Sequence, residues 1–271
     1  MMNIRGTEFD FSKTTYVMGI LNMTPDSFSD GGLHKTTEDA VAHALAMIKD
    51  GAAIIDIGGE STRPGYEPVP TEEESARVIP VIKAIRAVSD IPISIDTTKP
   101  SVAAEALTAG ADIVNSVAGL DLTQDMISVL TDSKAPFVMT YEKNYVNQFG
   151  EALIGMAEAA TEAGIAPEKI IVDPGIGFGK TQEENLRILN ELPIIAQIGY
   201  PILLGTSRKS VIGYALGEGE RLSGTITTTV LAALAGVGIV RVHDVAQNYR
   251  AIKMIEAICT QEVNDNGSDV H

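Results

Sequence analysis

Eight short apolar runs alternate with segments of helical periodicity along the 271 residues of this chain. The runs are rich in β-branched side chains, and each is short enough to be a buried strand. They cover residues 16–22, 54–58, 93–96, 113–116, 137–140, 170–173, 202–205 and 239–242. Strands and helices that alternate in this way predict an α/β protein with a parallel sheet, because the helices of βαβ units cover the sheet.

Eight units favour a single closed (β/α)8 TIM barrel over an open, doubly wound sheet, although periodicity alone leaves closure undecided. The length agrees with the roughly 250 residues typical of such a barrel, and on length alone two domains also remain possible. Hydrophobic residues make up 45% of the chain, which is enough for a large core. We predict one barrel domain over residues 1–260 and a polar, disordered tail at residues 261–271.

The segments between the runs carry helix start signals and apolar stripes. Three threonines each precede an acidic residue by three positions, which predicts N-terminal capping pairs at Thr36 with Asp39, Thr71 with Glu74 and Thr181 with Glu184. Two stripes at helical spacing should face the barrel, formed by Val41, Ala44, Leu45 and Ile48 and by Val78, Ile82 and Ile85. We expect Gly51 to end the first helix, and Cys259, the single cysteine, to be buried in the last one.

The formal net charge of −16 argues against nucleic acid and anionic membranes as partners, because both attract dense positive charge. No apolar run approaches the ~18 residues that a membrane span needs, and residues 1–10 lack the order of a secretory signal. We therefore expect a cytoplasmic protein with a small-molecule partner. An anionic partner would require the scarce positive charge at predicted loop positions, which is found at Arg63, Arg208, Lys209 and Arg241.

Polar residues follow seven of the eight runs, where a barrel enzyme carries its catalytic groups. They are Asn22, Asp56 with the segment 60–63, Asp96, Asn115, Asp173, Lys209, and Arg241 with His243. A turn or capping role is the better interpretation for any one of them taken alone. Seven polar strand ends at one rim favour an active site.

The segment 174–181, with the sequence PGIGFGKT, matches two nucleotide-binding motifs incompletely. Pro174 stands where a P-loop needs glycine, and Lys180 stands where a dinucleotide fingerprint needs its third glycine. The glycines are better explained by a tight turn after the sixth run. The sequence also argues against a zinc site, since the four histidines and one cysteine match no metal-binding spacing.

Seven blocks between about Val17 and Ile258 carry a family resemblance. They are MGILNMTPDSFSDGG at 18–32, DIGGESTRPG at 56–65, SIDT at 94–97, DPGIGFGKT at 173–181, LLGTSRKS at 203–210, RLSGT at 221–225 and RVHDV at 241–245. In this order, the blocks resemble the dihydropteroate synthases of folate biosynthesis. The resemblance implies a transferase that condenses 6-hydroxymethyl-7,8-dihydropterin pyrophosphate with p-aminobenzoate, giving 7,8-dihydropteroate and pyrophosphate.

The resemblance also implies roles for the polar strand ends. Asp173 and Asn115 would read the pterin, and Asp96 would stabilise the pterin cation. Lys209 would contact the pterin and support the departure of pyrophosphate, so that Lys209, Asp96 and Asp173 form the catalytic set. Further substrate contacts are implied for Met139, Gly205 and Phe178. Asp96 and Asp56 also have structural alternatives, which are to anchor a helix start or to pair within the barrel, and for Asp56 we favour a structural role.

Other implied roles concern the pyrophosphate, a metal ion and the second substrate. Arg241 and His243 would hold the pyrophosphate, and Asn22 would bind magnesium, a hard ion that keeps water and phosphate oxygens as ligands. Two loops would close over the aminobenzoate and carry Phe28, Thr62, Arg63 and Pro64. Ser210 would offer its backbone amide to the aminobenzoate carboxylate at a helix start. The resemblance further implies that the protein forms a homodimer and that sulfonamides target it.

This chain departs from the family pattern at two strand ends. Ser116 follows Asn115 where the family usually has Asp, and Met139, Thr140 and Tyr141 replace the usual Met-His-Met. These departures concern the predicted pterin pocket.

Two other functions remain as alternatives. A pterin-dependent methyltransferase would not need the predicted pyrophosphate cluster of Asn22, Arg63, Arg241 and His243. A non-catalytic pterin-binding homologue would not need Lys209. Structural roles also remain for Arg63, as a solvated loop charge, and for His243, as a donor to a backbone carbonyl.

Overall fold

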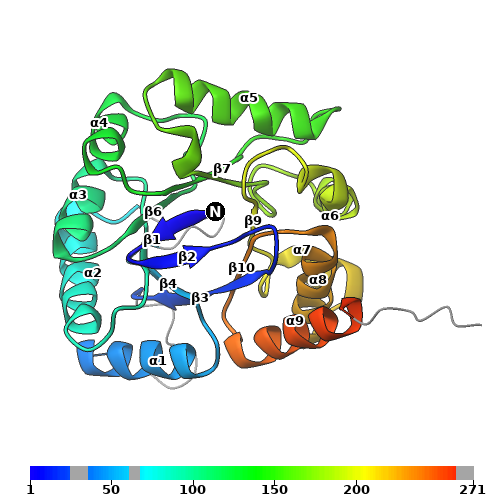
Figure 1. Ribbon diagram of the computed structural model, residues 1–271, viewed down its shortest axis with the longest axis horizontal. Helices are drawn as coiled ribbons and strands as arrows, with labels where there is room; N and C mark the ends of the chain where they lie inside the picture. The colour runs from blue at the N-terminus through cyan, green and yellow to red at the C-terminus, as the bar shows by residue number, and fades with distance from the viewer. Residues whose placement is uncertain (25–35, 61–67, 261–271) are drawn as a thin grey trace, which may run out of the picture.

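Eight parallel strands form a nearly closed barrel in the computed structural model, which describes residues 1–24, 36–60 and 68–260 (Figure 1). The sheet order is β8-β7-β6-β5-β4-β3-β10-β9, and a parallel bridge between Val172 and Ile202 joins β8 to the segment before β9. The strands are β3 (Tyr16–Asn22), β4 (Ile54–Gly58), β5 (Ile93–Asp96), β6 (Ile113–Ser116), β7 (Phe137–Thr140), β8 (Ile170–Asp173), β9 (Leu203–Leu204) and β10 (Ile239–Val242). The predicted barrel is confirmed, with only the seventh strand shorter than expected.

Helices surround the sheet on its outer side (Figure 1). They are α1 (Thr37–Lys49), α2 (Thr71–Arg86), α3 (Pro100–Ala109), α4 (Gln124–Ser133), α5 (Phe149–Glu162), α6 (Gln182–Ile195), α7 (Ser210–Leu216), α8 (Leu222–Ala235) and α9 (Val245–Cys259), with a 3-10 helix, η2 (Pro167–Lys169). The last connection therefore contains two helices, α7 and α8, instead of one. No helix within the described ranges is long and apolar enough to cross a membrane.

The predicted capping pairs at Thr36 and Thr181 are confirmed as capping boxes. The pair at Thr71 is wrong, because Pro70 precedes α2 and the Glu74 carboxylate is buried against Lys99, with 2.5 Å between Oε2 and Nζ. Because its carboxylate binds Lys99, Glu74 does not cap the start of α2. Gly51 follows the C-cap of α1 with a φ of +107°, as expected for a glycine that ends a helix.

The predicted stripe of α2 is confirmed, since Val78, Ile82 and Ile85 are fully buried. The stripe of α1 is rotated, because Ala40, Ala44 and Met47 are its buried residues whereas Leu45 is 42% exposed. Cys259 is also exposed, which contradicts the expected burial. It is the last residue of α9, whose buried face is formed by Val245, Asn248 and Ile252.

The interior of the barrel contains an apolar layer to which seven strands contribute. Its members are Met18, Ile54, Ile113, Val138, Ile171, Leu203 and Ile239, all fully buried. Buried residues at neighbouring strand positions, such as Val17, Ile55 and Val240, belong to a separate and larger cluster that includes the helices. The strand side chains thus alternate between the barrel interior and the helices.

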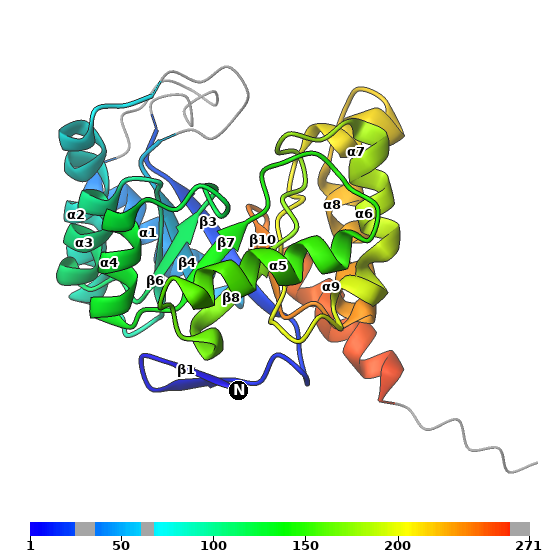
Figure 2. The ribbon, with the colours of Figure 1, turned by 90° about the horizontal axis from the view of Figure 1, so that it is seen from above.

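A hairpin that was missed in the sequence closes the amino-terminal end of the barrel (Figure 2). Strands β1 (Met2–Ile4) and β2 (Thr7–Phe9) pair antiparallel, and Met2, Ile4 and Phe9 pack on the apolar layer. Its turn, Arg5 and Gly6, has positive φ angles of 50° and 79°, which suit a tight two-residue hairpin connection.

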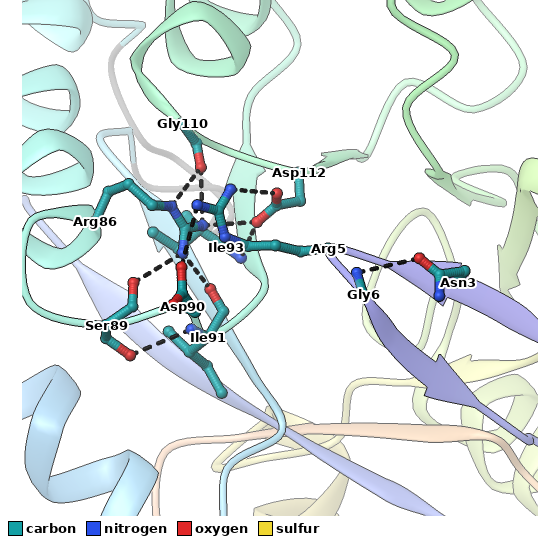
Figure 3. Close-up of polar contacts among 10 residues, drawn as sticks. All are labelled: Asn3, Arg5, Gly6, Arg86, Ser89, Asp90, Ile91, Ile93, Gly110 and Asp112. Atoms are coloured by element: carbon teal, nitrogen blue, oxygen red, sulfur yellow. Dashed lines mark hydrogen bonds and ion pairs between the residues drawn. The ribbon is translucent and has the colours of Figure 1, made fainter.

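Arg5 fastens the hairpin to the barrel (Figure 3). Its guanidinium lies 3.3 Å from an Asp90 oxygen and 3.4 Å from an Asp112 oxygen. Asp112 also accepts from Arg86 at 2.7 Å, and Arg86 donates to the Gly110 carbonyl at 2.8 Å. These contacts fix the closed end of the barrel and leave the carboxyl ends of the strands for chemistry.

We expect Phe9→Ala to lower the free energy of unfolding by about 3–5 kcal/mol, because it removes a fully buried ring from the closed end of the barrel. The exposed neighbour Thr7 provides a control, and Thr7→Ala should change stability by less than about 0.5 kcal/mol. Urea unfolding of both variants measures the difference. Equal stabilities for the two variants would show that the hairpin contributes little to the core.

Candidate active site

A polar layer lies directly above the apolar layer inside the barrel. It consists of the residues two positions further along each strand, which face the same interior. They are Ile20, Asp56, Asp96, Asn115, Thr140, Asp173, Gly205 and Arg241. The change from aliphatic to polar side chains occurs at the carboxyl ends of the strands, where barrel enzymes bind their substrates.

Arg241 is the centre of the polar layer. Its Nε lies 2.6 Å from Asp56 Oδ2, and its Nη2 lies 2.6 Å from Asp96 Oδ2. Asn115 Nδ2 donates to both Asp56 oxygens at 3.3 Å. The network joins β10 to β4, β5 and β6, and the Asp56 side chain is fully buried in it. Of the two structural roles considered for Asp56, pairing within the barrel is the one observed.

Two carboxylates share this one guanidinium, which affects their protonation. Burial raises the pKa of Asp96 to about 7 despite Arg241, and the neighbouring Asp56 carboxylate adds to the rise. Burial would lower the pKa of Arg241, but Asp56 and Asp96 more than offset this effect and hold it above its ordinary value. The polar layer thus keeps Arg241 charged and leaves Asp96 only partly ionised near neutral pH.

Asp173 and Lys209 both lie close to Gly205, which has no side chain. A Cβ built at Gly205 would lie 3.8 Å from Asp173 Oδ2 and 3.9 Å from Lys209 Nζ. Burial raises the pKa of Asp173 and lowers that of Lys209 to about 8, while their mutual attraction opposes both shifts. Lys209 Nζ donates to the Ile176 carbonyl and lies 4.5 Å from the centroid of the Phe178 ring. The structure thus brings together four predicted site residues.

The turn after β8 positions this group, as the sequence predicts. Gly175, Gly177 and Gly179 have positive φ angles of 71°, 85° and 64°. The Gly175 amide donates to Asp173 Oδ1 at 2.7 Å and so orients the carboxylate. Such backbone angles favour glycine, which explains the glycine-rich motif without a nucleotide.

Other predicted residues lie at the rim of the same mouth. His243 Nδ1 is 3.0 Å from Ser207 Oγ, and the exposed Ser210 accepts a hydrogen bond from Gln182 Nε2 at 3.1 Å. Arg208 is bound by both carboxylate oxygens of Asp244, at 2.6 and 3.1 Å.

Asn22 lies close to Asp96. A Cβ built at Gly58 would lie 3.6 Å from Asn22 Oδ1 and 3.8 Å from Asp96 Oδ2, so the two oxygens border the same space.

Met139 and Ser116 lie on the outer faces of their strands, opposite the face that forms the polar layer. Met139 is fully buried in the larger cluster and is not part of the polar layer, and its substrate contact stays a prediction. Ser116 is buried next to Asn115, and its Oγ accepts from the Ala118 amide at 3.3 Å. Thr140 takes the inward-facing position at the end of β7. Strand alternation, counted from Val138, identifies Thr140 as the inward residue.

Four predicted site residues lie outside the described residues, namely Phe28, Thr62, Arg63 and Pro64. Glu60 and Val69, which are described residues on either side of positions 61–67, are in direct contact: Glu60 Oε2 accepts from the Val69 amide at 2.8 Å and from Lys99 Nζ at 2.6 Å.

We expect Asp96→Asn to flatten the dependence of stability on pH. The folded-state pKa of Asp96 is raised above its unfolded value, so the folded state binds an extra proton between about pH 4 and pH 7, and stability falls as pH rises through about 7. Each pKa unit corresponds to about 1.4 kcal/mol. Urea unfolding at about pH 5.5 and about pH 8 should show a smaller difference in Asp96→Asn than in the wild type. An unchanged pH dependence would contradict the raised pKa.

Comparison with known proteins shows which family the chain resembles. The model of the family described as "Pterin binding enzyme" matches residues 18–243. Dihydropteroate synthase of Clostridium beijerinckii is 49% identical, covering 95% of this chain and 99% of the relative, and that of Bacillus subtilis is 47% identical, covering 95% and 93%.

Solved structures agree with the sequence relatives. Yersinia pestis dihydropteroate synthase with a sulfonamide drug superposes with a TM-score of 0.89 at 36% identity, covering 96% of this chain and 99% of that one. The Xanthomonas albilineans enzyme in complex with 7,8-dihydropteroate gives a TM-score of 0.84 at 39% identity, covering 92% and 95%. The chain therefore belongs to the pterin-binding enzyme family and, within it, to the dihydropteroate synthases.

Proposed function

We propose that the polar mouth of the barrel condenses 6-hydroxymethyl-7,8-dihydropterin pyrophosphate with p-aminobenzoate to form 7,8-dihydropteroate. The C–O bond to pyrophosphate breaks with its electron pair, the amine nitrogen bonds to the methylene carbon, and the amine loses a proton. The observation that carries the proposal is the grouping of the Asp173 carboxylate and the Lys209 ammonium next to Gly205 within the polar layer. The methyltransferase alternative has no use for the cations of this group.

Asp173 and Asn115 would recognise the pterin through its hydrogen-bonding edge. The Gly175 amide holds the Asp173 carboxylate, which is an acceptor for ring N–H and amino groups. The Asn115 amide nitrogen donates to Asp56, which leaves its carbonyl oxygen as an acceptor for the ligand. Phe178 adds an aromatic ring beside Lys209. The polar layer thus offers acceptors on two sides of one flat ring.

Charge stabilisation would drive the reaction. A methylene beside an electron-rich ring can lose pyrophosphate before the amine arrives, so the enzyme must mainly stabilise separating charges. Lys209, with Arg241 and His243, would face the leaving group, and the Asp96 carboxylate would face the pterin cation. The Arg241 side chain is 18% exposed although it pairs with two aspartates, which leaves a limited part of it for a phosphate oxygen.

Magnesium would assist at Asn22. Its amide oxygen borders the same space as Asp96 Oδ2, and oxygen donors of this kind suit a hard divalent cation. The described part of the chain holds no group of three His, Cys, Asp or Glu that would form a complete metal cage. This fits an ion whose other ligands are water and phosphate, and bound magnesium would neutralise charge on the pyrophosphate.

The aminobenzoate would bind where α7 begins. We assign its carboxylate to the backbone amide of Ser210 and its ring to the loops that carry Phe28, Thr62, Arg63 and Pro64. Since the Yersinia pestis structure contains a sulfonamide drug, we propose that sulfonamides compete with aminobenzoate here as well.

We also propose a cytoplasmic homodimer. Large apolar side chains on three neighbouring helices are more than half exposed, and burial against a second copy would remove them from water. They are Tyr214 and Leu216 on α7, Leu234 on α8, and Met254 and Ile258 on α9.

The function is tested by mixing the pterin pyrophosphate, magnesium and p-aminobenzoate with the purified protein and measuring pyrophosphate release. We expect release that requires p-aminobenzoate and is accompanied by an equal amount of 7,8-dihydropteroate. Omitting the protein provides the blank. Release of pyrophosphate without formation of the pteroate would identify a hydrolase, and binding without release would identify a non-catalytic homologue.

Lys209→Ala and Asp173→Ala should separate chemistry from recognition. Loss of one electrostatic stabiliser of a leaving group costs about a hundredfold or more in turnover, so Lys209→Ala should lower the single-turnover rate more than the affinity. Asp173→Ala removes a contact that is also made in the ground state and should weaken pterin binding directly. If Lys209→Ala reacts at the wild-type rate under saturating pterin pyrophosphate, Lys209 is only a binding residue.

A further inference from the structure

The Lys180 ammonium lies between the loops that follow β7 and β8 and is enclosed by backbone carbonyls. Its Nζ donates to the carbonyl of Tyr141 at 2.6 Å, of Phe178 at 2.9 Å and of Gly175 at 3.1 Å. The rings of Tyr141 and Phe149 flank it, with centroids 5.2 and 5.9 Å away. An ammonium has three protons, so these carbonyls use all of its donors.

The ammonium joins two loops whose backbones are in direct contact. A Cβ built at Gly175 would lie 2.1 Å from the Tyr141 carbonyl oxygen, and one at Gly179 would lie 2.3 Å from that of Glu142. Carbonyl oxygens that converge in this way repel one another unless a cation lies between them. Lys180 therefore holds the turn at 174–179 in the conformation that its three left-handed glycines permit.

This turn contacts Asp173, which we assign to pterin recognition, and Lys209, which we assign to the pterin and the leaving group, whereas the hydrogen bonds of Lys180 go to neither side chain. The Gly175 amide holds the Asp173 carboxylate, and the Ile176 carbonyl accepts from Lys209. The Phe178 ring lies beside the same Lys209 ammonium. Movement of the turn would therefore displace the hydrogen-bond partners of Asp173 and Lys209 together.

We propose that Lys180 is a positioning residue for pterin binding, whose ammonium fixes the turn at 174–179 and thereby orients the Asp173 carboxylate and the Lys209 ammonium. This inference rests on the proposed roles of Asp173 in pterin recognition and of Lys209 beside the pterin and the leaving group. It also explains the lysine of the glycine-rich motif, whose ammonium binds the loop itself and has no proton left for a phosphate.

The surrounding charges fit a permanently bound ammonium. Burial lowers the pKa of Lys180 to about 8, but the carboxylates of Asp173 and Glu142 oppose this shift. Both Glu142 oxygens are buried and lack a hydrogen-bond partner within the described residues. A neutral side chain at position 180 would leave the three carbonyls without their shared donor, which is costly for buried polar groups.

Lys180→Met tests the proposal, because it keeps the length of the side chain and removes the ammonium. Lys143→Met is a matched control on the neighbouring loop, since the Lys143 side chain is 58% exposed and its ion pair with Asp121 spans 3.9 Å. Calorimetry with 6-hydroxymethylpterin measures affinity, and thermal unfolding measures stability. We expect Lys180→Met to raise the Kd at least about tenfold and Lys143→Met to change it less than about twofold.

A merely structural role for Lys180 predicts another result. Lys180→Met would then have a lower unfolding temperature but bind 6-hydroxymethylpterin with the wild-type Kd, which would overturn the proposal. If Lys180→Met does not fold, Lys180→Arg replaces it. Its planar fork cannot direct three donors from one nitrogen. We expect a Kd raised at least about threefold, and a wild-type Kd in Lys180→Arg would overturn the proposal.

Failure of the proposed function gives a separate result. If Asp173→Ala binds 6-hydroxymethylpterin with the wild-type Kd, the pterin-binding role assigned to Asp173 is wrong, whatever the Lys180 variants show.

Discussion

The placement of one guanidinium between two aspartates inside the barrel determines the rest of the site. Arg241 joins β10 to Asp56 on β4 and Asp96 on β5, and Asn115 extends the network to β6. Removing one partner of a buried ion pair typically costs about 3–5 kcal/mol, because the remaining charge is left uncompensated. A well-packed apolar layer of the same volume would often be as stable or more stable. The polar layer is therefore best explained by its chemistry.

Stability is supplied elsewhere in the same barrel. The apolar layer and the hairpin close the amino-terminal end, and Arg5 fastens that hairpin to Asp112. With this end fixed, the carboxyl ends of the strands hold carboxylates and ammonium groups in surroundings that alter their pKa values, as at Asp96 and Lys209. Electrostatic catalysis requires charged groups that are held in place before the substrate arrives.

Sequence reasoning located the strands well because fully buried parallel strands are short, continuous apolar runs with clear ends. It failed where contacts between distant parts of the chain determine the local structure. The hairpin strands have three residues each and show no periodicity that would reveal them. The sequence pattern predicts a capping role for Glu74, but its carboxylate binds Lys99 from another βα unit.

The candidate site was predicted by residue type better than by direction. The polar strand ends are brought together around Arg241 and Lys209, but Met139 lies on the helix side of its strand and Thr140 on the inner side. The family blocks identify which residues lie at a strand end. Strand alternation identifies which of those residues point into the barrel. Lys180 was overlooked because its partners are backbone carbonyls, which leave no pattern in the sequence.

A crystal structure of the protein with 7,8-dihydropteroate would test the central claim most directly. The account predicts the pterin ring inside the mouth, with ring nitrogens within about 3.2 Å of the Asp173 carboxylate and the Asn115 amide oxygen. Arg241 should remain between Asp56 and Asp96 in that complex. A pterin bound outside the barrel mouth, without contact to Asp173 or Asn115, would contradict the assignment of the polar layer as the active site.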